Sequence, residues 1–198
     1  MTPRHRGQDQ HLPVEQLDPL VAEQACLSGQ LEPLGGPLED LGSAHRRQPY
    51  RASRSGRGVT VGRLAYLLIP ALAERDVTVG VERPMHLDDL TEPLPDVWIA
   101  RGGPSGYNDR HPSAHDLLLA VEVSDTALGR DLRRKLPAHA TAGIPVVWVV
   151  ALGAGEVLEH RDPHGSLSLY RSVRSAGRGA TLNVPGTDLS VAVDDLLP

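Results

Sequence analysis

The 198-residue sequence contains little that could cross-link it or carry it across a membrane. Its single cysteine, Cys26, has no partner, which excludes an internal disulfide scaffold and a zinc site built from several cysteines. The longest apolar stretch, residues 144–153, is about half of the roughly 20 residues that a membrane-spanning helix needs. The first thirty residues are polar and lack the apolar core of a secretion signal, so we expect a cytoplasmic protein.

Two further residue types are scarce. Phenylalanine is absent, so leucine, valine and alanine must fill most of the core. Of the 20 basic residues only Lys135 is a lysine, and all the others are arginine. A lysine kept in such a chain is a candidate for chemistry that arginine cannot perform, because an ammonium is a compact charge of adjustable pKa whereas a guanidinium is a planar fork. Chance is the alternative explanation.

The composition changes near residue 58, and we expect a divergent, flexible N-terminal segment over residues 1–58 followed by one domain over residues 59–198. All six glutamines lie before residue 58, whereas only two of the nineteen valines do. Residues 41–58 are turn-rich and contain five arginines and no acid, which favours a solvated linker over a phosphate-binding arm. The net charge of −5 argues against wholesale electrostatic binding to nucleic acid, but it permits a local basic groove.

Hydrophobic spacing predicts a mixed sheet with helices on both faces. Leucines and an alanine at i, i+3, i+4, i+7 and i+8 form one face of a helix over 64–72, and a second helix runs to about residue 141, where Gly143 ends it. The predicted strands are 77–81 (with the pattern resuming to 87), 96–100, 117–123, 146–152, a hairpin of 156–160 with 167–173, and a short element over 189–197. His160 and His164 flank the hairpin turn and are expected to be exposed. Strands that are apolar on both faces need helices above and below, so the fold class is α/β or α+β.

Glu122 is the most informative position, because it interrupts the apolar run 117–123. An ionised carboxylate in a buried strand costs several kcal/mol unless it is paired or bound to a cation. Asp96 lies at the start of the preceding predicted strand. If the two strands are neighbours, both carboxylates can converge on one hard divalent ion such as Mg²⁺ or Mn²⁺. A strand-end carboxylate without a function is the alternative for Asp96.

The next predicted helix carries three polar residues at i, i+4 and i+8, namely Asp131, Lys135 and His139. This spacing places all three on one helix face, which is a candidate to meet the strand that carries Glu122. The alternative is an ordinary surface ion pair between Asp131 and Lys135, which would contribute less than about 1 kcal/mol.

The segments PDVWIA and LLLAVEVSDTALGRDLRRKLPAHATAGIPVVWVV, together with their spacing, resemble the Uma-two family of the PD-(D/E)XK nuclease superfamily. The resemblance covers about residue 59 to the C-terminus and is densest over 95–150. It implies a restriction-endonuclease-like mixed sheet flanked by helices, and a nuclease site dependent on Mg²⁺ or Mn²⁺. Asp96 and Glu122 would be the metal ligands, and Lys135 would orient or activate the attacking water. In the usual superfamily pattern the lysine stands where Ser124 stands here, so Lys135 would reach the same place from the helix.

The resemblance therefore implies an endonuclease that hydrolyses DNA phosphodiester bonds, with no membrane partner and with a homodimer as one open possibility. Two departures from the family pattern are visible. His139 stands where members usually have tyrosine, and their Tyr-Glu-Leu hairpin is missing from residues 1–58. Either that segment is divergent, or the upstream start site or reading frame is not the family's. A catalytically inactive binding or vestigial protein of the same fold is the alternative function.

Overall fold

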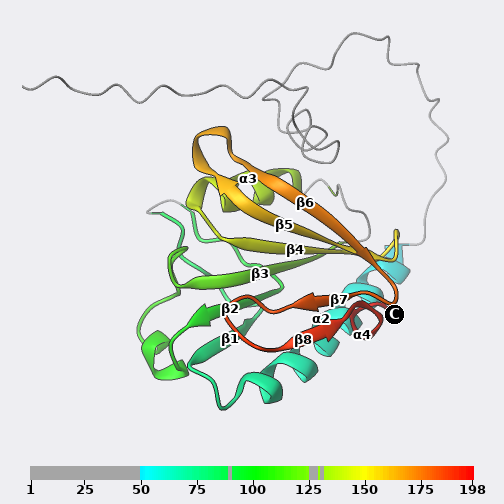
Figure 1. Ribbon diagram of the computed structural model, residues 1–198, viewed down its shortest axis with the longest axis horizontal. Coiled ribbons are helices and arrows are strands. Elements are labelled where there is room, and N and C mark those ends of the chain that lie inside the picture. The colour runs from blue at the N-terminus through cyan, green and yellow to red at the C-terminus, as the bar shows by residue number, and fades with distance from the viewer. Residues whose placement is uncertain (1–49, 89–90, 125–128, 130–131) are drawn as a thin grey trace, which may run out of the picture.

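The computed structural model describes residues 50–88, 91–124, 129 and 132–198, which fold around one six-stranded sheet (Figure 1). A separate two-stranded sheet lies near the C-terminus. In chain order the elements are α2 (Tyr50–Leu72), β1 (Val77–Val81), β2 (Val97–Arg101), the 3-10 turn η2 (Pro104–Tyr107), β3 (Leu117–Ser124), α3 (Leu132–Ala142), β4 (Val146–Ala151), β5 (Glu156–His164), η3 (Gly165–Leu167), β6 (Leu169–Gly177), β7 (Thr181–Asn183), β8 (Ser190–Ala192) and α4 (Val193–Leu196).

Strands β1 to β6 stand in the sheet in the order in which they occur in the chain. Every neighbouring pair is antiparallel except β3 and β4, which are parallel. A parallel pair needs a long crossover, and α3 lies within it. Helix α3 ends as predicted at Gly143, whose φ of +80° suits the left-handed conformation that follows many helices.

Helices cover both faces of the sheet. Leu64, Leu68 and Leu72 of α2 are buried in a cluster on one face, which also contains α4 (Figure 1). Leu132 and Leu136 of α3 belong to the cluster on the other face. The central strands β3 and β4 are buried along almost their whole length, which is why their sequences are apolar at successive positions. The predicted fold class, a mixed sheet flanked by helices, is confirmed.

The first described helix begins earlier than the sequence predicted. Helix α2 starts at Tyr50 and therefore crosses the boundary predicted at residue 58. The glycines and arginines before that point hide the apolar period, so the sequence pattern became legible only from Leu64. Residues 1–49 lie outside the described part, so the flexible N-terminal segment stays a prediction. Within the described part, no helix is long and apolar enough to cross a membrane.

The prediction that His160 is exposed is wrong. Strand β5 continues to His164, so His160 lies inside the strand and is only 4% exposed, with its ring edge-on to Tyr170. Neither ring nitrogen of His160 has a hydrogen-bond partner among the described residues. Burial lowers the pKa of His160 from 6.5 to about 4. His164, in contrast, is half-buried at the strand end.

Candidate active site

Asp96 lies immediately before β2, and Glu122 lies in the neighbouring antiparallel strand β3. The register pairs Val97 of β2 with Val121 of β3, and Asp96 and Glu122 are the residues next to this pair in their segments. Asp96 is 1% exposed and Glu122 is 3% exposed. Two buried acids need polar or positively charged partners, because a buried polar group without a partner is costly.

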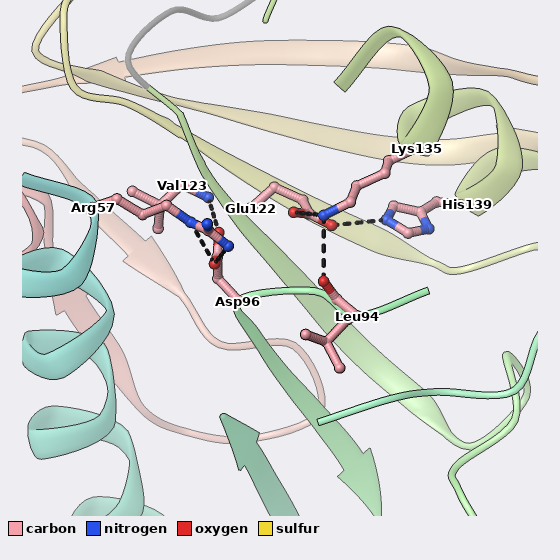
Figure 2. A network of polar contacts seen from close by, with 7 residues as sticks. All are labelled: Arg57, Leu94, Asp96, Glu122, Val123, Lys135 and His139. Atoms are coloured by element: carbon pink, nitrogen blue, oxygen red, sulfur yellow. Dashed lines mark hydrogen bonds and ion pairs between the residues drawn. The ribbon is translucent and has the colours of Figure 1, made fainter. Parts of the chain in front are cut away.

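Glu122 receives its partners from α3. The Lys135 Nζ donates to Glu122 Oε2 over 2.7 Å and to the Leu94 carbonyl over 3.3 Å (Figure 2). His139 Nε2 lies 3.3 Å from the other carboxylate oxygen, Glu122 Oε1. Lys135 and His139 are one turn apart, so they present their side chains to the same strand. The Lys135 side chain is 17% exposed and that of His139 is fully buried.

Asp96 receives its partners from α2 and from the strand itself. The Arg57 Nε donates to Asp96 Oδ1 over 2.8 Å, and the Arg57 Nη2 contacts the same oxygen (Figure 2). The other oxygen, Asp96 Oδ2, accepts the Val123 amide over 2.6 Å. The hydrogen bond to Asp96, followed by the negative charges of Asp96 and Glu122, raises the pKa of Arg57. The Arg57 guanidinium is therefore the ion-pair partner of Asp96.

The remaining predicted residues lie differently. Ser124 ends β3 two positions after Glu122, is half-buried, and accepts the Leu152 amide at its carbonyl over 2.8 Å. The ammonium at Glu122 comes from Lys135 on the helix and not from position 124. Asp131 lies outside the described residues. The His139 Nδ1 is buried and has no hydrogen-bond partner in the described part of the chain.

Sequence reasoning missed Arg57, which it had assigned to a linker. A signal was present, because Arg57, Val61 and Leu64 are spaced i, i+4 and i+7 and lie on one helix face. Val61 and Leu64 are buried, so this face points into the molecule. Extending the apolar face backward by two turns would have placed one arginine of the basic stretch toward the core.

The chemistry of these donors fits a hard divalent cation. Mg²⁺ prefers oxygen ligands, and proteins often supply one or two carboxylates while substrate phosphates and waters complete the coordination. Asp96, immediately before β2, and Glu122, in the neighbouring strand β3, are two such carboxylates. The described residues contain no group of three or more histidines, cysteines or acids placed to hold a metal ion.

Comparison with known proteins places this arrangement in a family. A family profile described as "Uma2: Putative restriction endonuclease" matches residues 53–194, which include Arg57, Asp96, Glu122, Lys135 and His139. The chain belongs to the Uma2 family. No curated protein matches it significantly.

A solved structure has the same fold as this Uma2 chain. It is the crystal structure of "a putative nuclease belonging to DUF820" from Anabaena variabilis ATCC 29413. The TM-score is 0.51 at 14% sequence identity, and the match covers 75% of this chain and 82% of that one. At this identity the likeness shows a shared fold, which agrees with the restriction-endonuclease-like architecture that the sequence predicted.

Proposed function

We propose that this Uma2 protein is a metal-dependent endonuclease that hydrolyses phosphodiester bonds in DNA. The observation that carries the proposal is the position of Lys135. The only lysine of the chain donates to a buried glutamate in β3, and a second buried acid, Asp96, lies immediately before the neighbouring strand β2. Membership of the Uma2 family, whose description is "Putative restriction endonuclease", supports the reaction class.

Each residue would have a distinct task. Asp96 and Glu122 would hold Mg²⁺ or Mn²⁺, which when bound supplies Lewis-acid polarisation of the phosphate. Lys135 would orient the attacking water and place its positive charge where negative charge develops on the phosphate. Its partial exposure allows it to reach a ligand that enters from solvent. His139 would act as a supporting residue that fixes the orientation of the Glu122 carboxylate.

One observation favours the alternative, a catalytically inactive protein of the same fold that binds a ligand or is vestigial. All four oxygens of the two carboxylates already have protein partners: Arg57 and Val123 at Asp96, and Lys135 and His139 at Glu122. The buried negative charges are therefore compensated without an ion, so the cluster could persist for structural reasons alone.

The deciding experiment incubates the purified full-length protein with plasmid and linear DNA in Mg²⁺, in Mn²⁺ or in EDTA. The proposal expects cleavage in the metal buffers, none in EDTA, and loss of most activity in the Glu122→Gln and Lys135→Arg variants. Glu159→Gln is the matched control, because Glu159 is as buried as Glu122 but lies in β5 and pairs with Arg161, which is not part of the candidate site. A folded wild-type protein that cleaves neither DNA with either metal would favour the inactive alternative.

A further inference from the structure

The Arg57–Asp96 pair differs from the Lys135–Glu122 pair in exposure. The Arg57 side chain is 48% exposed, whereas that of Lys135 is 17% exposed. Lys135 is also held by the Leu94 carbonyl. Asp96 itself is 1% exposed, so the Arg57 guanidinium lies between this carboxylate and the solvent.

The contacts at Asp96 leave little capacity for another cation. Its Oδ1 accepts from two nitrogens of Arg57, and its Oδ2 accepts the Val123 amide. A divalent ion on the same carboxylate would lie within a few ångströms of the guanidinium, where like charges repel strongly in a partly buried site. A divalent ion on Asp96 would therefore be destabilised for as long as the guanidinium keeps its place in the observed arrangement.

We propose that Arg57 is the resident counter-ion of Asp96 and that a divalent cation must displace it in order to bind. This inference rests on the proposed function, because it assumes that Asp96 is a metal ligand. The displacement requires only a rotation of the Arg57 side chain, since Val61 and Leu64 anchor the next turns of α2 in the core. The exposed guanidinium can turn into solvent without breaking apolar packing.

The inference makes metal binding weaker than the two carboxylates alone would allow. The displaced Arg57 guanidinium would remain beside the site, where it can form paired hydrogen bonds with a phosphate. Arg57 would then contribute to the affinity for DNA only when the divalent ion is bound.

The test is a calorimetric titration of Mn²⁺ into the full-length protein at fixed pH, with Asp96→Asn as the reference that identifies the site. Arg57→Gln should bind Mn²⁺ about tenfold or more tightly than the wild type, because a positive charge beside the ligand is gone. Arg57→Lys keeps the charge but loses the fork, and it should fall between the two. Arg63→Gln is the matched control on the same helix, since Arg63 contacts the Leu197 carbonyl and should leave the affinity unchanged.

Circular dichroism melts of each variant establish that it is folded before it is titrated. Equal or weaker Mn²⁺ binding by Arg57→Gln, with Asp96-dependent binding in the wild type, would overturn the displacement and leave the proposed metal site intact. If neither the wild type nor any variant binds Mn²⁺, both the displacement of Arg57 and the metal dependence of the proposed function are overturned. The second readout is the affinity for a short DNA duplex in Ca²⁺, which Arg57→Gln should weaken even though it binds metal more tightly. Unchanged duplex affinity would overturn the transfer of Arg57 to phosphate.

Discussion

Replacement of Lys135 by alanine should destabilise the protein even if the protein has no enzymatic activity. The Lys135 ammonium lies 2.7 Å from a carboxylate that is 3% exposed, so the substitution leaves Glu122 buried with only His139 beside it. Removal of one partner from a buried ion pair costs about 3–5 kcal/mol, because the remaining charge is uncompensated. Since the Lys135 side chain is 17% exposed, water can replace part of the lost interaction, and we expect about 2–4 kcal/mol.

A double-mutant cycle separates this cost from the loss of packing. Glu122→Gln removes the buried charge, so Lys135→Ala should cost far less in that background than in the wild type. The coupling between the two residues should be about 2 kcal/mol or more, which is large compared with an exposed pair. The assay is urea unfolding of the four proteins, monitored by circular dichroism at pH 7 in buffer without divalent ions.

The reasoning fails if Lys135→Ala costs only a few tenths of a kcal/mol, which is the value for a solvated pair on a helix face. It also fails if the effects of the two substitutions simply add. Parallel cleavage assays distinguish the catalytic role, because Lys135→Arg retains a positive charge yet places it elsewhere. That variant should lose most of its activity while it keeps more stability than Lys135→Ala, and full activity would refute a specific role for the ammonium.

Three further outcomes are expected. Mn²⁺ should raise the melting temperature of the wild type by mass action and should raise that of Glu122→Gln much less, and equal shifts would argue against a shared carboxylate site. The pKa of His160 is about 4 in the folded protein and 6.5 in the unfolded chain, so the free energy of unfolding of the wild type should fall by about 3 kcal/mol as the pH falls from 6.5 to 4. His160→Leu should remove this loss, and urea unfolding at both pH values measures the difference. Gly80→Ala should cost about 1–3 kcal/mol in thermal unfolding, because a Cβ there would overlap the buried Trp98 ring, and an unchanged melting temperature would contradict this packing.

The fold could be predicted because its strongest signals are local. Strands β3 and β4 are apolar at successive positions, which only a strand buried on both faces requires. The strand at Val77–Val81 alternates, and Gly143 ends α3 where the pattern indicated. The short strand β7 was missed because three residues with one buried side chain carry too little periodicity to detect.

The candidate site could be predicted only in part, since its contacts join distant segments. A lone acid in an apolar strand and a lone lysine in an arginine-rich chain are each unusual in the sequence itself, and the structure brings these two residues together. The Arg57–Asp96 contact joins residues 39 positions apart, and the arginine has many equivalents along the chain. The amino-acid composition gave no reason to select Arg57 among the arginines. Only its position on the buried face of the helix distinguishes Arg57 from its neighbours.

The lysine beside Glu122 comes from helix α3 and not from strand β3, and the two positions differ in what they contact. In a strand, residues 122 and 124 point to the same face about 6.6 Å apart, so a lysine at position 124 would approach the carboxylate from along the strand. Lys135 instead reaches Glu122 from α3 and also donates to the Leu94 carbonyl. Leu94 lies two residues before Asp96 in the chain. One ammonium thereby links the helix, the central strand and the chain entering β2. Its position depends on how α3 packs, which Leu132 and Leu136 set through the core. Any ligand that draws Lys135 away from Glu122 must therefore loosen this three-way contact, whereas a ligand that draws Arg57 away releases only a half-exposed side chain. We therefore expect a ligand to displace Arg57 more readily than Lys135.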